Sequence, residues 1–447
     1  MQKLGGPVFT PGERFANGKE HRKKLRRVDQ GEWKPTKNRP DPVELILASV
    51  RGRLRDLIPI KMARMSASPF GFFRGAAPLM AADLSSMPHC GLEAQICGDA
   101  HVRNLGAYAA PDGHLVFDIN DFDETLRGPF EWDLKRLSTS LVLAGQQSGH
   151  EKKTCKDAVR LFVKSYCAAM LRFSELPVVE LAKYQLHVRV GPVQAALRKA
   201  ERSTPEHTLE KLTVRSAGKH KFKDERPLLA PVRSQVAREV IGALALYQQT
   251  LSPERQQFLS CYQPVDVAFK VVGTGSVGLR DYVVLCFGNG ERDPLFLQVK
   301  EEAPSCYTRY LSPSQNFINE GKRVVDGQRR MQAYSDPFLG WTSMGGRDYL
   351  VRQLSDHKAS IDDSQMQGNG LTEYARVCGE VLAKGHARSG DPMQLAGYCG
   401  PGNKLDDAMA EFADRYAEQT VRDFEVLKKA IKAGKIGIAT NSRGTGF

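Results

Sequence analysis

The sequence predicts an α+β protein with two lobes, a mainly helical lobe that comes first and a β-rich lobe that follows. Between residues 41 and 260, apolar residues recur mostly at the three- and four-residue spacing of amphipathic helices. The pattern changes near residue 264, where short apolar runs rich in β-branched residues alternate with glycine turns. Helical periodicity returns after residue 361. Helices and strands segregated along a chain in this way are typical of α+β folds.

The helical lobe contains its own short strands. An amphipathic helix is expected at 42–57, followed at 64–75 by an aromatic cluster with Arg74 that predicts a tight, packed turn. Arg74 either reaches a phosphate or pairs with a buried carboxylate. A strand at 92–96 and a hairpin of 105–108 with 115–117 come next. The remaining expectations are helices at 132–142, 155–173, 178–183 and 236–251, with a loop or small subdomain at 200–226.

The β-rich lobe begins with an apolar run. Strands are expected at 265–272, 282–287 and 294–299, because each is apolar and is bounded by glycine-containing turns. A helix at 317–333, a strand at 349–354 and helices at 371–387 and 406–431 follow. The expected organisation is a basic, loosely ordered segment (1–40), the helical lobe (41–260), the β-rich lobe (261–360), helices returning to the first lobe (361–435) and a flexible tail (436–447).

Composition excludes several classes of protein. The chain has 447 residues and nine cysteines, none in a Cys-x-x-Cys pair, which argues against a disulfide framework or a structural zinc site. No apolar run approaches the length of a membrane helix, and residues 1–37 lack an apolar signal core. We therefore expect a cytoplasmic protein without a membrane partner. The net charge of +13 suits an anionic partner, either a nucleotide or a nucleic acid, although basic residues are spread along the whole chain.

Two polar clusters carry the chemistry of the first lobe. Asp99 and His101 open a segment in which Asn104 lies five positions after Asp99, and a strand then leads to Asp121 and Asp123. This is the layout of a kinase-type catalytic loop followed by a metal-binding aspartate. It predicts that Asp99 accepts the proton of a substrate hydroxyl, with His101 beside it in the catalytic loop. Asn104, Asp121 and Asp123 are the candidate Mg²⁺ ligands.

A glycine loop in the second lobe predicts a phosphate site. The expected phosphate-binding residues are Gly273, Gly275, Ser276 and Gly278. Here the loop joins two strands, as in a kinase phosphate lid, whereas a dinucleotide-binding loop opens a helix. Missing side chains let backbone N–H groups approach phosphate oxygens closely.

Lysine 300 ends the strand that follows this loop and hairpin. A kinase fold keeps at this place the lysine that contacts the α- and β-phosphates. Such a lysine needs an orienting carboxylate from the next helix. Glu320 is the expected partner, since Glu301 and Glu302 are too close in sequence to come from another element.

Several motifs together resemble the bacterial family called domain of unknown function 2252. They are residues 68–75, 98–101, 120–124, 271–278 and 298–301, and the resemblance extends from about Arg22 to Asp391. Residues 97–104 are also similar to the catalytic loop of aminoglycoside and choline phosphotransferases, except that Cys97 replaces the leading His. This second resemblance implies that Asp133 braces the catalytic loop through its backbone N–H groups, and it favours a small-molecule acceptor over a protein.

The order of the motifs departs from ordinary kinases. The glycine loop and lysine follow the catalytic loop instead of preceding it, and the helix at 371–387 resembles the one that normally leads into that loop. Circular permutation accounts for this order, although two unrelated modules would give it too. Under permutation, residues 349–354 become the strand whose backbone holds adenine, so Arg352 and Gln353 are further nucleotide-binding candidates.

The expected activity is an ATP- and Mg²⁺-dependent transfer of phosphate to an unknown hydroxyl acceptor. A kinase fold can also transfer AMP, and the sequence leaves this open. Two other classes remain as alternatives. A metal-dependent phosphohydrolase would use the Asp99 and His101 motif but lacks the later histidine motifs of such enzymes. A non-catalytic nucleotide or nucleic-acid binder would suit the basic charge, although no nucleic-acid motif accompanies it.

Overall fold

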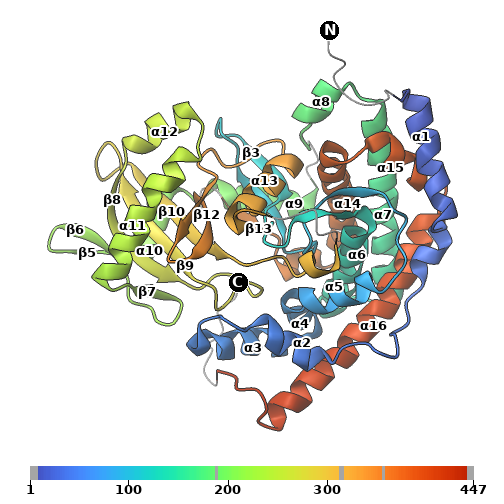
Figure 1. Cartoon of the computed structure of the whole chain (residues 1–447), viewed down its shortest axis with the longest axis horizontal. Helices are drawn as coiled ribbons and strands as arrows, with labels where there is room; N and C mark the ends of the chain where they lie inside the picture. The colour runs from blue at the N-terminus through green and yellow to red at the C-terminus, as the bar shows by residue number, and fades with distance from the viewer. Residues whose placement is uncertain (1–8, 187–189, 312–316, 355–357, 440–447) are drawn as a thin grey trace.

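A computed structural model of the chain describes residues 9–186, 190–311, 317–354 and 358–439. It is a mixed α+β structure, which confirms the predicted class. Most helices gather on one side of the molecule and the largest sheet lies on the other (Figure 1).

The helices and strands described have the following bounds. The helices are α1 Pro11–Glu20, α2 Pro42–Ser49, α3 Ile58–Ser66, α4 Pro69–Gly75, α5 Ala77–Ser85, α6 Phe130–Gln147, α7 Lys152–Glu175, α8 Val178–Lys183, α9 Gly191–Glu201, α10 Pro205–Leu212, α11 Ser234–Gln249, α12 Pro253–Ser260, α13 Glu320–Met331, α14 Gly370–Ser389, α15 Pro392–Cys399 and α16 Lys404–Lys432. The strands are β1 Glu93–Ile96, β2 Leu105–Ala109, β3 Leu115–Ile119, β4 Leu126–Pro129, β5 Thr213–Ser216, β6 Lys219–Phe222, β7 Leu229–Pro231, β8 Gln263–Lys270, β9 Asp281–Phe287, β10 Pro294–Glu302, β11 Gly340–Met344, β12 Arg347–Gln353 and β13 Ala359–Ser360.

Helices α6, α7, α14 and α16 form the centre of the helical side. Nearly every residue of α6 is buried, because other helices and the short strands surround it. Leu141 of α6, Phe162 of α7, Leu382 of α14 and Phe412 of α16 belong to one continuous hydrophobic core. This core fixes the position of α6, and α6 in turn supplies side chains to the site.

The large sheet is antiparallel, with the strand order β11-β12-β10-β9-β8-β7. Its central strands β9 and β10 are buried on both faces, which explains their continuous apolar sequences. On one face Val284 and Leu297 pack with Tyr247 of α11. On the other face Phe296 packs with Leu209 of α10.

Short strands on the helical side carry the first polar cluster. Strand β1 pairs with β4, while β2 and β3 form the expected hairpin, extended by β13. The turn between β1 and β2 and the segment after β3 lie close together, since the Asn120 N–H donates to the Asn104 carbonyl at 3.0 Å. Helix α13 contacts both β12 of the large sheet and α14 of the helical side.

The N-terminal segment differs from the prediction. Residues 1–8 lie outside the described part, but residues 11–20 form α1 instead of a loosely ordered chain. Thr10 and Glu13 form a reciprocal capping box at its start, and α1 packs against α15. A spacing of threonine and glutamate three residues apart was therefore a usable helix signal, which the polar composition of the segment obscured.

Two other local predictions need correction, and a third is made more specific. The helix expected at 42–57 ends at Ser49, because the chain turns at Gly52, whose φ is +80°, before α3 begins. The aromatic turn expected at 64–75 is largely helix α4, capped by the Ser68 side chain. The loop or subdomain expected at 200–226 contains α10 and the β5–β6 hairpin. Residues 440–447 of the expected tail lie outside the described part.

A search of the described helices finds none that is long and apolar enough to cross a membrane.

Candidate active site

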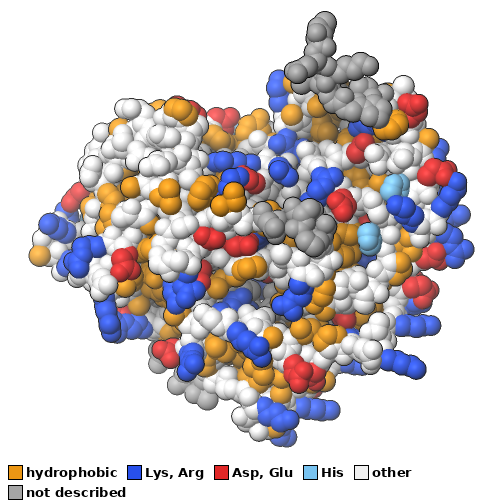
Figure 2. Space-filling model, in the orientation of Figure 1, with side chains coloured by type: hydrophobic (Ala, Val, Ile, Leu, Met, Phe, Trp, Pro, Cys, Tyr) orange, Lys and Arg blue, Asp and Glu red, His pale blue; other side chains and the backbone are white. Residues whose placement is uncertain are grey.

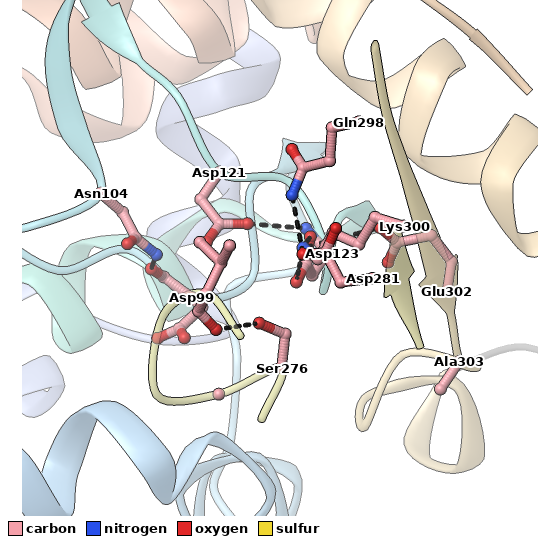
Figure 3. A network of polar contacts seen from close by, with 12 residues as sticks. Asp99, Asn104, Asp121, Asp123, Ser276, Asp281, Gln298, Lys300, Glu302 and Ala303 are labelled. Carbon is pink, nitrogen blue, oxygen red and sulfur yellow. Dashed lines mark hydrogen bonds and ion pairs between the residues drawn. The ribbon is translucent and has the colours of Figure 1, made fainter. Parts of the chain in front are cut away.

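A cavity of about 730 Å³ brings the two polar clusters together. Its wall includes Asp99, His101, Asn104, Asp121 and Asp123 from the helical side and Gly273, Gly275 and Ser276 from the β-rich side. The cavity therefore joins segments that are far apart in sequence, and Figure 3 shows several of these side chains together.

The loop of residues 97–104, here called the aspartate loop, is held by its backbone. The Asp133 carboxylate accepts hydrogen bonds from the N–H groups of Cys97 at 2.8 Å and Gly98 at 3.0 Å, which bears out the expected bracing. His386 of α14 lies 3.3 Å from the same carboxylate. Gly98 has a φ of +79°, and a Cβ there would lie 2.3 Å from the Glu124 carbonyl oxygen, so only glycine fits.

Asp99 points one oxygen at a buried arginine and leaves the other for a ligand. Arg136 of α6 donates from Nε to Asp99 Oδ1 at 2.6 Å. His101 Nε2 lies 3.9 Å from Oδ2. Burial raises the pKa of Asp99, although Arg136 opposes the shift. Asp99 thus sits in a desolvated site with a fixed orientation.

His101 is a neutral ring with an assignable tautomer. Burial, followed by the charges of Arg74 and Arg136, lowers the pKa of His101 well below its usual value. The Arg103 N–H donates to Nδ1 at 3.2 Å, which leaves the ring hydrogen on Nε2, the nitrogen that faces Asp99. His101 can therefore donate toward Asp99 or toward a ligand between them.

Asn104 and Asp121 are the metal candidates that have free oxygen atoms. The Asn104 amide donates to the Asp99 carbonyl at 2.9 Å, so its amide oxygen is available. Burial, followed by the adjacent charge of Asp123, raises the pKa of Asp121 to about 7. A carboxylate in such surroundings is stabilised by a bound cation.

Lys300 pairs with Asp123, across 177 residues of sequence, and not with Glu320 (Figure 3). Burial alone would raise the pKa of Asp123, but Lys300 holds it below its usual value. Glu320 instead binds Arg323, one turn along α13. The second carboxylate near Lys300 is Glu302, whose Oε1 lies 3.7 Å from the ammonium.

The pairing expected for Glu320 is wrong, and closeness in sequence was a poor reason to reject Glu302, which does lie beside Lys300. Residues two apart on a strand share a face, so Glu302 lies beside Lys300 on β10. Burial, followed by the charge of Asp123, raises the pKa of Glu302 well above its usual value. Strand alternation is the signal that would have identified it.

The loop of residues 273–278, here called the glycine loop, is held by cations at its carbonyl groups. Lys61 of α3 donates to the carbonyls of Thr274 at 3.0 Å and Gly275 at 2.9 Å. Arg53 donates to Gly275 at 2.6 Å and Val277 at 2.8 Å, and Arg64 donates to Gly273. Because C=O and N–H point in opposite directions across a trans peptide, the N–H groups next to the carbonyls bound by Lys61 are directed away from α3.

Arg352 lines the cavity, whereas Gln353 is engaged elsewhere. Arg352 donates from Nε to Gln298 Oε1 at 2.9 Å, and Gln298 donates to Asp281 at 2.8 Å. The Gln353 N–H donates to Asp336 at 2.6 Å, and its carbonyl accepts from Lys358 at 2.8 Å. Both backbone groups of Gln353 are occupied within the protein, which speaks against the adenine contact expected for it.

Arg74 is an arginine of the cavity wall whose charge the structure leaves unmatched. Among the described residues it forms no ion pair within 4 Å, and its Nε is buried without a hydrogen-bond partner. Of the two alternatives expected for Arg74, the pair with a buried carboxylate is therefore not found among the described residues. Arg136 and Lys61, which the sequence did not single out, fix the aspartate loop and the glycine loop respectively.

The described residues contain no group of three or more His, Cys, Asp or Glu side chains arranged to hold a metal ion. Mg²⁺ commonly takes one or two protein oxygens together with phosphates and water, so it does not need such a group. Asn104 and Asp121 fit this pattern, because each has an unshared oxygen at the cavity. Asp123 is committed to Lys300.

Comparison with families shows what the chain is related to. A family model described as "Uncharacterized protein conserved in bacteria (DUF2252)" matches residues 53–430. The chain belongs to this family. The match covers most of the cavity wall, the aspartate loop and the glycine loop, and its description assigns no activity. Searches of curated proteins and of solved structures found no match.

Proposed function

We propose that this member of the DUF2252 family is an ATP- and Mg²⁺-dependent phosphotransferase with a permuted kinase-like fold. The observation that carries the proposal is the ion pair between the buried Lys300 and Asp123, because Asp123 lines the cavity together with Asp99, Asn104 and Asp121. A phosphate-binding lysine next to metal-binding and proton-accepting residues is the constellation that phosphoryl transfer requires.

Each residue has a distinct part in this proposal. Asp99 accepts the proton of the acceptor hydroxyl through Oδ2, while Arg136 fixes Oδ1. Asn104 and Asp121 would hold Mg²⁺, and Lys300 with the N–H groups of the glycine loop would bind phosphate oxygens. When bound, ATP would supply the transferable phosphoryl group and Mg²⁺ would neutralise the negative charge of its phosphates. The residues contribute position and electrostatics, which are the main means of catalysis in phosphoryl transfer.

The contacts of α14 support permutation. Its last residue, Ser389, accepts a hydrogen bond from the Gln95 N–H of β1 at 3.2 Å. His386 of the same helix lies near Asp133, which braces the aspartate loop. The helix that would lead into the catalytic loop of an unpermuted chain therefore ends beside the strand that leads into it here.

Melting temperature tests nucleotide binding. We expect Mg²⁺ with ATP to raise the Tm of the wild-type protein, by the equivalent of about 2.7 kcal/mol at one hundred times Kd. Lys300→Met should remove the rise, because it removes the phosphate-binding charge. The matched control Lys322→Met, at an exposed lysine of α13 paired with Asp326, should keep it. A wild-type Tm indifferent to Mg²⁺ and ATP would contradict the proposal.

Turnover tests the role of Asp99. Asp99→Asn should lower turnover per folded molecule by roughly 10²- to 10⁴-fold, the usual contribution of a general base, while the Tm rise with ATP remains. Label from the γ-phosphate should appear on the acceptor. Label from the α-phosphate would instead indicate AMP transfer. Release of free phosphate from a phosphate ester in the absence of ATP would favour the phosphohydrolase.

A further inference from the structure

We infer that the acceptor of the proposed transfer carries an anionic group, a carboxylate or a phosphate monoester, that binds Arg74. This inference rests on the proposed function and specifies its substrate class. It narrows the small-molecule acceptor that the similarity of the aspartate loop to aminoglycoside and choline phosphotransferases favours.

Charge compensation differs between the arginines near Asp99. Arg136 is compensated by Asp99 itself. Arg103 is compensated by Asp363 at 2.6 Å, with Asp362 at 3.8 Å. Arg74, which lines the same cavity, has neither carboxylate within ion-pair distance among the described residues. Arg74 therefore contributes to the wall of this cavity a positive charge with which no carboxylate of the described residues pairs, and its Nε lacks a hydrogen bond such as those that Arg53 and Arg352 make.

The position of Arg74 is fixed by the protein. It lies in the last turn of α4, whose start is capped by Ser68 and whose Phe73 carbonyl accepts from Arg136 at 3.1 Å. A buried Nε without a partner is costly, because nothing replaces the water that it loses. An anionic ligand restores both the missing hydrogen bond and the missing charge.

The same geometry sets where the acceptor hydroxyl lies. Asp99 Oδ1 is occupied by Arg136, so the hydroxyl approaches Oδ2, beside the neutral His101 ring. Arg74, His101 and Asp99 line the same cavity. An acceptor that spans the two needs a hydroxyl at one end and an anion at the other.

A matched acceptor series tests the inference. Glycerol, glycerate, glycerol 3-phosphate and 3-amino-1,2-propanediol share one skeleton and differ in charge; glucose, glucuronate, glucose 6-phosphate and glucosamine form a second set. Transfer of labelled γ-phosphate should occur with anionic members and favour them over the neutral and cationic ones. The carboxylate and phosphate arms distinguish the two sources of negative charge. Higher efficiency with a neutral or cationic member would overturn the inference.

A variant of Arg74 tests whether this side chain binds the acceptor or the nucleotide. Arg74→Gln should lower kcat/KM for the anionic acceptor by about 10- to 100-fold, as expected for loss of a charged hydrogen bond, and leave KM for ATP within about twofold. Arg330→Gln, at an exposed arginine of α13 outside the cavity, is the control. A raised KM for ATP with unchanged acceptor kinetics would assign Arg74 to the nucleotide and overturn the inference.

Binding measurements keep the outcome decisive if no acceptor in the series is turned over. With Mg²⁺ and a non-hydrolysable ATP analogue present, anionic members should raise the Tm of wild type but not of Arg74→Gln. No such Arg74-dependent rise, in a protein whose Tm still responds to Mg²⁺ and ATP, overturns the inference and leaves the proposed function intact. Failure of the proposed function is recognised separately, as a Tm indifferent to Mg²⁺ and ATP.

Discussion

The aspartate loop and the glycine loop meet at one cavity but are held in opposite ways. A carboxylate, Asp133, accepts from N–H groups of the aspartate loop. Cationic side chains, Lys61 among them, donate to carbonyls of the glycine loop. Holding the glycine loop by its carbonyls leaves N–H groups of that loop unbound by these side chains. The aspartate loop instead presents the side chains of Asp99 and Asn104 to the cavity. The two loops therefore offer groups of opposite polarity.

Positive and negative side chains are mixed on the outer surface of the molecule that Figure 2 shows. Lys and Arg side chains are interspersed with Asp and Glu over the face drawn in Figure 2. The excess of positive charge is therefore not gathered there into one continuous patch. At the cavity, by contrast, carboxylates lie on and after the aspartate loop, and Arg53 and Lys61 hold the glycine loop.

The largest effect should come from breaking the support of the aspartate loop. Asp133→Asn replaces one acceptor oxygen by an NH₂ group that faces a backbone N–H, so a buried donor loses its partner. We expect the free energy of unfolding to fall by about 3 kcal/mol, measured by urea denaturation. Asp326→Asn, at an exposed ion pair of α13, should change it by less than about 0.5 kcal/mol. Equal stability of the two variants would show that Asp133 does not fix the loop.

Glycine-to-alanine substitutions should change stability to different extents in the two loops. Gly98→Ala requires a Cβ 2.3 Å from the Glu124 carbonyl oxygen at a φ of +79°, and should cost about 2 kcal/mol of stability. At Gly275 the nearest atom to an added Cβ is the Arg74 carbonyl oxygen at 3.9 Å. Gly275→Ala should therefore change stability by less than about 1 kcal/mol. Under the proposed function it should still weaken ATP binding, because a methyl group hinders close approach of phosphate.

Calorimetry and a nucleotide titration of both variants check this contrast. A Gly275→Ala protein that binds ATP as wild type does would remove the glycine loop from the nucleotide site. A Gly98→Ala protein of wild-type stability would show that the backbone near Glu124 adjusts at little cost.

The parts of the fold and site that the sequence predicted are those set by local pattern. Apolar runs identified β9 and β10. The resemblance of the aspartate loop to phosphotransferases implied that Asp133 braces that loop, as it does. The partner of Lys300 was missed because it comes from a segment 177 residues away. Gln353 was misjudged because Asp336 and Lys358, which occupy its backbone, are not marked by any motif.

The residues that hold the glycine loop also could not be predicted from local sequence patterns. Lys61 lies in a helix whose basic residues are ordinary in sequence, and only the folded chain brings it against the Thr274 and Gly275 carbonyls. The charge excess of the chain predicted an anionic partner in general but could not say which cations are surface charges and which fix a loop. That distinction depends on burial, which is a property of the fold.

The last expected effect depends on pH and concerns Lys61. Burial lowers the pKa of Lys61 well below its usual value of 10.5, since carbonyl groups and no carboxylate hold it. The unfolded chain therefore binds one more proton than the folded protein between the lowered pKa and 10.5. The free energy of unfolding contributed by this group rises with pH across that window, by at most about 1.4 kcal/mol per pH unit, and is constant below it.

Lys61→Met isolates this contribution, because methionine has a similar length and does not titrate. Urea denaturation of both proteins from pH 7 to pH 10 should give a difference in unfolding free energy, wild type minus variant, that increases with pH. A difference that stays flat would mean that Lys61 remains fully charged in the folded protein. The glycine loop would then be fixed by a permanently charged lysine side chain.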